Sequence, residues 1–239
     1  MLSFEIARWH AWAPGLHHAD QWNGWAQAPY CPIALSDTPR VDFLPALQRR
    51  RLSPMARMVF ASAWPAAEGY PPMPVVYASR HGETTRGFEL LRTLASEECL
   101  SPTSFGLSVH NAILGQWSIA RRETLESVAL STEGAGAEHA FMEACALLAQ
   151  GYERALVMLT EEAPPAAYAT WTGDILFPHA AAFVVERGEQ IHLELAPDGG
   201  QPEGADLPST LNLLRHLSLG SSCWRYRTDK HSWTWTRKG

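Results

Sequence analysis

The stretch that decides the fold runs from residue 128 to residue 151 and reads VALSTEGAGAEHAFMEACALLAQG. Residues 128–130 are apolar and a serine follows them, which is typical of a short buried strand. Glycines at 134 and 136 predict a tight turn, and residues 137–150 carry apolar side chains at helical spacing. Gly151 stands where a glycine commonly follows the end of a helix. The stretch therefore predicts a strand, a glycine turn and a helix in immediate succession.

The flanking sequence alternates between strand-like and helix-like segments, and residues 1–30 are expected to form a short strand followed by irregular chain. Further strands are expected at 75–79, 155–160, 181–186 and 191–195, the last two as a hairpin that turns at Gly188. Helices are expected at 43–64, 82–96, 105–116 and 207–217, with a loop at 197–206. This alternation predicts an α/β fold with a mixed five-stranded sheet covered by helices on both faces, as a single domain over residues 1–239.

The composition argues against two broad classes of protein. Of the 239 residues, 46% are hydrophobic and 18% are charged, so the chain can bury a sizeable core and is not a disordered acidic polypeptide. The net charge of −6 argues against nucleic acid as a partner, because phosphate binding depends on clustered Lys and Arg. The one basic cluster, residues 49–51, precedes a helical pattern and is interpreted as the start of a helix.

The cysteines indicate a reducing compartment. Cys31, Cys99, Cys145 and Cys223 are widely spaced and form no CxxC pair, so neither a metal knuckle nor a dense disulfide framework is expected. The N-terminus carries no signal-peptide pattern, and no apolar run is long enough to span a bilayer. We therefore expect a cytoplasmic protein without a membrane span, a metal or a cofactor.

A glycine turn that leads into a helix can hold a nucleophile at the helix N-terminus or let the backbone approach a phosphate. Here Glu133 and Glu138 flank the glycines and would repel a phosphate. The match to a dinucleotide-binding fingerprint is also poor. These residues favour a turn related to a nucleophile site over a phosphate site.

Three stretches carry a resemblance to the β-ketoacyl synthases of the thiolase-like fold. They are RRRLSPMARM at 49–58, SPTSFGLSVHNAILG at 101–115 and ACALLAQGYERALV at 144–157. The first resembles the early Arg-rich helix of the family, the second its segment that leads toward the active-site strand, and the third the helix and strand that follow its nucleophile. The likeness spans residues 45–187 and implies the N-terminal half of that fold.

The resemblance places the family's nucleophilic cysteine at Gly134, which has no side chain to hold an acyl group. Cys145 lies eleven residues later, about three helical turns away, too far to replace it. The family's two catalytic histidines belong to a C-terminal half that this chain is not expected to contain. The resemblance therefore implies that the chain catalyses no condensation on its own.

Within the family, such a chain is similar to the chain-length factors, and most to those of aryl-polyene biosynthesis. The resemblance implies a heterodimer with an active ketosynthase, whose cysteine carries the acyl chain and which meets the acyl carrier protein. The subunit described by this sequence would shape the apolar tunnel that holds the growing chain.

Position in the family pattern also implies which residues form the tunnel and the interface. Phe105 is expected to form a tunnel wall, with core packing as the alternative. His110 is expected to be hydrogen-bonded inside the chain or near the interface. The full set of expected tunnel and interface residues is Ser104, Phe105, Leu107, His110, Asn111, Trp117, Glu133 and Gly134.

Two other functions remain open on sequence grounds. An acyl-thioester enzyme could use Glu133 or His139 in place of the missing cysteine, although no Gly-x-Ser-x-Gly elbow supports a hydrolase with Ser131. A stand-alone acyl-binding module could reuse the remnant pocket without a partner enzyme. His139 and Glu143 have a spacing that can bind a metal on a helix, but the sequence places no third ligand.

Overall fold

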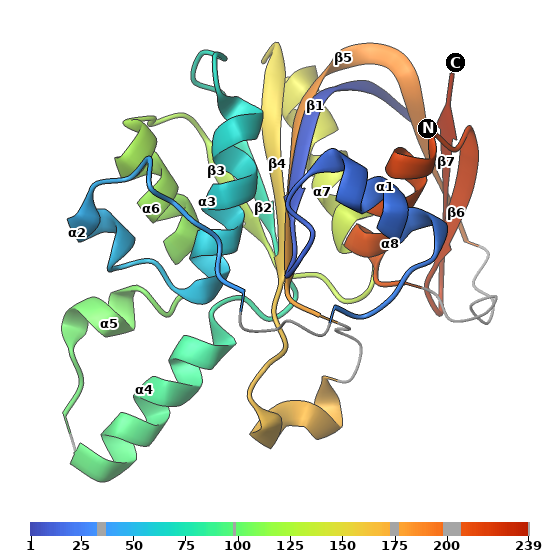
Figure 1. Cartoon of the computed structure of the whole chain (residues 1–239). Coiled ribbons are helices and arrows are strands. Elements are labelled where there is room, and N and C mark those ends of the chain that lie inside the picture. The colour runs from blue at the N-terminus through green and yellow to red at the C-terminus, as the bar shows by residue number, and fades with distance from the viewer. Residues whose placement is uncertain (33–36, 98, 173–176, 198–206, 239) are drawn as a thin grey trace.

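The centre of the fold is a mixed sheet of seven strands (Figure 1). The computed structural model describes residues 1–32, 37–97, 99–172, 177–197 and 207–238, and the predicted loop at 197–206 lies almost entirely outside them. Strand order in the sheet is β3-β2-β4-β5-β7-β6, and β1 pairs with β5. The predicted α/β class is confirmed, but the predicted number of five strands is wrong. The strands are β1 (Leu2–Trp12), β2 (Val75–Ala78), β3 (Ser127–Leu130), β4 (Arg154–Glu161), β5 (His179–Ala196), β6 (Cys223–Arg227) and β7 (Ser232–Arg237).

The part of the sheet that positions the site is parallel. Strand β2 lies between β3 and β4 and runs parallel to both. The carboxyl ends of these three strands therefore meet at one edge of the sheet, which is where ligands bind in open α/β folds. Strand β5 runs antiparallel to β4, so its first residue, His179, pairs with Glu161 at the same edge.

The predicted hairpin over 181–195 is wrong, because β5 is one continuous strand of 18 residues. Its first half pairs with β4 and its second half with β7, while β1 follows it along both halves. Gly188 does not form a turn: a Cβ there would lie 2.8 Å from the Cβ of Glu5 on β1. The glycine lets the two backbones approach each other where the register of β1 on β5 shifts.

Both faces of the sheet are buried at its centre, which explains why β4 is apolar along nearly its whole length. Helices α3 (Pro54–Ala67) and α6 (Ala112–Arg121) cover one face; α7 (Gly136–Ala149), with α1 (Ala19–Gln27) and α8 (Ser209–Leu219), covers the other (Figure 1). Leu156 and Met158 face the α3 side, and Val157 and Leu159 face the α7 side.

Several helix predictions need correction. The chain after β1 was expected to be irregular, yet α1 forms there and buries Trp22 and Trp25. The helix expected at 43–64 is divided into α2 (Ala46–Arg49) and α3, and the one at 105–116 into α5 (Pro102–Gly106) and α6. Strand β6 was missed.

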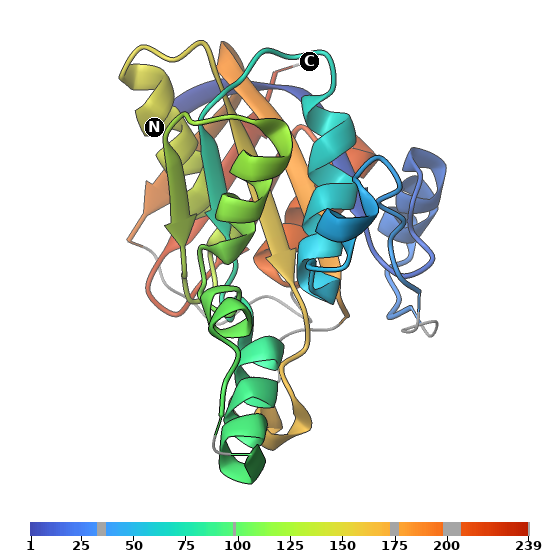
Figure 2. The same cartoon turned by 90° about the vertical axis from the view of Figure 1, so that its left-hand side faces the viewer.

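Helices α4 (Thr84–Glu97) and α5 project away from the sheet together with the short helix η1 (Ala166–Trp171) (Figures 1 and 2). The apolar face that the sequence shows on α4 is not part of the core, since Leu91 is 59% exposed and Leu94 is 43% exposed. The part of the chain that the structure describes holds no helix long and apolar enough to cross a membrane.

Candidate functional site

The glycine turn between β3 and α7 has a backbone that a side chain would strain. Gly134 has a φ of +79°, in the left-handed region that favours glycine. Two successive hydrogen bonds close the turn, from the amide of Ala135 to the carbonyl of Glu133 (3.1 Å) and from the amide of Gly136 to the carbonyl of Gly134 (2.8 Å). The first amides of the turn are therefore already paired within it.

The N-terminus of α7 is satisfied by buried groups of the chain itself. The amide of Ala137 donates to Ser209 Oγ (2.9 Å), and that hydroxyl donates to Glu138 Oε2 (2.6 Å). The indole Nε1 of Trp235 donates to Glu138 Oε1 (3.1 Å). Glu138 is 1% exposed, and burial raises the pKa of its carboxyl group. The helix end that would favour a thiolate thus already has a carboxyl group beside it.

A small cavity of about 40 Å³ lies behind the turn, at the edge where the parallel strands end. Its walls bring together Thr132 after β3, Glu161 at the end of β4 and His179 at the start of β5. The cavity has room for a few water-sized groups. The remaining lining residues are Arg80, Gly134, Gly136, Pro208, Ser209 and Thr210.

Among the residues of this cavity that the sequence did not reveal, His179 is the most deeply buried. It is fully buried, and its Nδ1 donates to the carbonyl of Phe177 (2.9 Å), so Nε2 carries the lone pair. Nε2 has no hydrogen-bond partner among the described residues. Burial lowers the pKa of the imidazole to about 4, and the side chain is neutral at pH 7. A lone histidine after a proline has no motif that could have identified it.

On the outer side of the turn, the residues considered for a hydrolase do not form a catalytic set. Ser131 Oγ donates to the carbonyl of Arg80 (2.9 Å), and Nδ1 of His139 bonds the carbonyl of Ala135 (2.6 Å). Glu133 is exposed and forms an ion pair with Arg80 (3.2 Å). Among the described residues, no contact on this side of the turn pairs a hydroxyl nucleophile with a base.

Cys145 does not provide a substitute nucleophile. It lies in α7 and is half-buried, and burial raises the pKa of its thiol to about 11. Within the described ranges, no three His, Cys, Asp or Glu side chains gather as a metal site would require, and His139 with Glu143 gains no third ligand.

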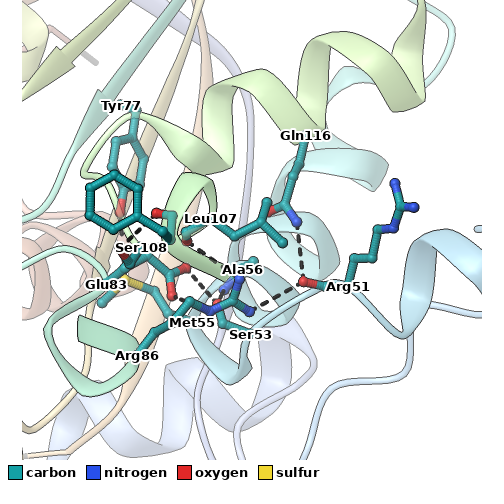
Figure 3. A network of polar contacts seen from close by, with 11 residues as sticks. Arg51, Ser53, Met55, Ala56, Tyr77, Glu83, Arg86, Leu107, Ser108 and Gln116 are labelled. Carbon is teal, nitrogen blue, oxygen red and sulfur yellow. Dashed lines mark hydrogen bonds and ion pairs between the residues drawn. The ribbon is translucent and has the colours of Figure 1, made fainter. Parts of the chain in front are cut away.

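The expected wall residues lie on α5 and at its C-terminal end. Phe105 is 59% exposed, so its alternative role as a core residue is wrong for this chain. Ser104 and Leu107 are half-buried. The network in Figure 3 joins this segment to the body of the fold through Arg86, which contacts Leu107, Arg51 and Glu83.

The other expected interface residues are divided between core and surface. His110 bonds the carbonyl of Leu130 (2.9 Å) and covers Gly82, where a Cβ would lie 2.4 Å from its Nδ1. Asn111 is exposed at the start of α6. Trp117 was expected near a partner surface, but it is 1% exposed and packs against Phe60 and Trp64, so that expectation is wrong.

An apolar cavity of about 120 Å³ lies beside the wall segment, between α2, α3, α5 and α6. Leu107 and Thr103 line it on one side, and Leu52, Phe60 and Ile119 are among the residues of the other walls. Such a cavity accepts hydrocarbon more readily than a polar group.

Comparison with known proteins gives one family and a set of solved structures. The family described as "Beta-ketoacyl synthase, N-terminal domain" matches residues 22–236. One chain of "Ketosynthase (ApeO) in Complex with its Chain Length Factor (ApeC) from Xenorhabdus doucetiae" is similar with a TM-score of 0.88 and 28% identity, over 99% of this chain and 100% of that chain.

Two further solved structures show the fold alone, because their sequence identity is low. A chain of the ishigamide ketosynthase/chain length factor has a TM-score of 0.72 at 14% identity, over 99% of this chain and 100% of that one. A β-ketoacyl synthase from Burkholderia phymatum has a TM-score of 0.60 at 14% identity, over 93% of this chain and 71% of that one. Comparison with curated proteins found no match.

Proposed function

This chain belongs to the β-ketoacyl synthase N-terminal domain family, and on that basis we propose that it is a non-catalytic chain-length factor. It would pair with an active ketosynthase and form part of the tunnel that holds the growing acyl chain. The family resemblance expected from the sequence is confirmed. The similar solved structure named for a ketosynthase in complex with its chain length factor supports the proposed role.

The observation that carries the proposal is the state of the turn at Gly134. The position where the family resemblance places the nucleophile holds Gly134 in a left-handed conformation, and the following helix end is occupied by Ser209 and Glu138. A side-chain nucleophile is missing, and so is the free helix terminus that would stabilise its anion. Both features fit a subunit that forms part of the tunnel wall while its partner catalyses the condensation.

The projecting arm of α4, α5 and η1 supports a protein partner. Leu91, Leu94, Phe105 and Trp171 expose large apolar side chains there. Strand β3 lies at the end of the sheet order, so one of its backbone edges faces away from β2. An exposed apolar surface and an unpaired strand edge both favour association with another chain. A ketosynthase subunit that covers this arm would bring Phe105 toward its own acyl site.

Within the proposed complex, Ser104, Phe105 and Leu107 form the wall of the tunnel, and His110 and Asn111 lie near the interface. The partner's cysteine carries the acyl group, and the partner meets the acyl carrier protein. The proposed pathway is that of an aryl polyene, because the sequence most resembles the chain-length factors of that pathway. The whole chain would act as one domain in the cytoplasm, where its four cysteines remain reduced.

Purification of the tagged chain from its native host tests the proposal. We expect a ketosynthase with an intact cysteine to co-purify at a one-to-one ratio, and the pair to condense malonyl units that neither chain condenses alone. The double variant Leu91→Glu, Leu94→Glu should lose the partner without losing thermal stability, because both side chains are exposed. Met142→Glu on α7, also exposed, is the matched control.

If the chain remains a monomer and forms no complex with any ketosynthase of its host, the proposal is contradicted. Tight binding of a fatty acyl ligand by such a monomer would favour the stand-alone acyl-binding module instead. Hydrolysis or transfer of an acyl thioester by the isolated chain, lost in His139→Ala, would favour the enzyme.

A further inference from the structure

Helix α5 carries the proposed wall residue, but apolar packing does not hold it in place. It has five residues, from Pro102 to Gly106, and none of them is buried. A helix of this length is unstable by itself, because few hydrogen bonds offset the entropy of ordering it. The position of Phe105 must therefore depend on contacts made by the ends of the helix.

The main contact at the C-terminal end of α5 comes from Arg86. Its Nη1 donates to the carbonyl of Leu107 (3.4 Å), and its Nη2 donates to the carbonyl of Arg51 (3.2 Å), as Figure 3 shows. Gln116 Nε2 donates to the same carbonyl of Arg51 (3.2 Å). A cation is also favourable at the C-terminus of a helix. The guanidinium thus joins α5 to the loop before α3.

Glu83 fixes the orientation of that guanidinium. Its buried Oε2 lies 3.5 Å from Arg86 Nε, and its Oε1 accepts a hydrogen bond from Ser53 Oγ (2.6 Å). Ser53 is the N-cap of α3 and accepts the amide of Ala56 (2.9 Å), so it anchors the carboxylate to the core. The side chain of Arg86 is largely buried, and its fork is held from three sides.

We propose that Arg86 is a positioning residue for the tunnel wall: it holds α5 at a fixed place against α3 and thereby sets the depth at which Phe105 stops the acyl chain. This inference rests on the proposed function. Arginine is needed because its planar fork spans two carbonyls and a carboxylate together. The ammonium of a lysine is a single point charge and cannot reach all three.

Hydrogen exchange on the full chain tests the positioning without a partner. The amides of Phe105, Leu107 and Ser108 are hydrogen-bonded within the α5 segment. In Arg86→Lys we expect these amides to exchange about tenfold faster, as the loss of one charge-assisted hydrogen bond implies. The amide of Val157 in β4 serves as the reference for global stability. Arg92→Lys, on the same helix but paired only at the surface with Glu89, should change nothing.

The complex of this chain with its ketosynthase tests the effect of Arg86 on product length. Arg86→Lys and Phe105→Ala should both shift the products toward longer and more varied chains. Unchanged exchange in Arg86→Lys would overturn the positioning role. Faster exchange with normal products, while Phe105→Ala lengthens them, would overturn the role in product length. If neither variant alters the products, the proposed tunnel wall itself is refuted, although Arg86 still orders α5.

Discussion

The family resemblance places a nucleophilic cysteine at position 134, and the structure predicts that Gly134→Cys would introduce a thiol there without introducing catalysis. The backbone at Gly134 has a φ of +79°, where a residue with a Cβ is strained by roughly 1–2 kcal/mol. The new Cβ would also lie 3.3 Å from Cγ2 of Thr228, so that side chain must move. For a chain of this size, 1 kcal/mol corresponds to about 2–4 °C in Tm. We expect Gly134→Cys to lower the Tm by about 2–8 °C.

The thiol introduced by Gly134→Cys should also be a poor nucleophile. Ser209 and Glu138 already satisfy the start of α7, and a carboxylate there opposes a second negative charge. We therefore expect no acyl transfer to the variant from an acyl thioester and no condensation by the isolated chain, measured by mass spectrometry of the intact protein. Gly136→Ala is the matched control: its Cβ would meet only Thr132 Oγ1 at 3.5 Å, an ordinary contact.

Thermal unfolding of a further variant separates the backbone strain at position 134 from the contact with Thr228. Gly134→Ala in a Thr228→Ser background keeps the backbone strain and removes the Cγ2 contact, so the remaining loss of stability measures the strain at position 134. A Gly134→Cys chain that melts with the wild type and takes up an acyl group would refute the reasoning. It would show that the turn can relax and that the helix end remains available to an anion.

Three further predictions concern stability and product length. The pKa of His179 is lowered to about 4 in the folded chain, so unfolding takes up a proton at mildly acidic pH. Between pH 7 and pH 4.5 the free energy of unfolding of the wild type, measured by urea titration, should therefore fall by about 2–3 kcal/mol more than that of His179→Gln. The same pH dependence in both proteins would disprove this. Ser209→Ala should lower the free energy of unfolding by about 2–4 kcal/mol, because it leaves the buried Glu138 with fewer hydrogen-bond donors and the amide of Ala137 without its acceptor. A decrease of less than about 1 kcal/mol would contradict this. Phe105→Ala should leave the free energy of unfolding within about 1 kcal/mol, since the ring is 59% exposed, and lengthen the products of the proposed complex.

Local patterns in the sequence were enough to predict the secondary structure of the segment around the glycine turn. Apolar spacing and two glycines predicted a strand, a turn and a helix, and β3 and α7 lie there within one residue of the expected limits. Gly151 follows the end of α7 with a φ of +115°, as its position after the helix implied. These features depend on residues a few positions apart in the chain, and so they can be predicted from the sequence alone.

Patterns were less reliable where an element depends on distant contacts. The dip in apolar character near Gly188 predicted a hairpin, but β1 and β7 support β5 as one strand. The helix expected at 82–96 forms as α4, but its apolar side chains lie on a helix that projects away from the sheet (Figure 2). Apolar spacing shows that a face exists; it does not show whether the chain's own core or another protein covers it.

The sequence by itself determined the α/β class, the family and the absence of a side chain at position 134. Only the tertiary structure decided how that position is surrounded. Ser209 reaches the start of α7 across 72 residues of chain, and Glu161 and His179 meet the turn at the edge of the sheet. Likewise, Arg86 on α4 donates to the carbonyl of Arg51, which lies in the loop before α3. Such contacts depend on the direction of single side chains between distant segments, and no periodicity in the sequence encodes that direction.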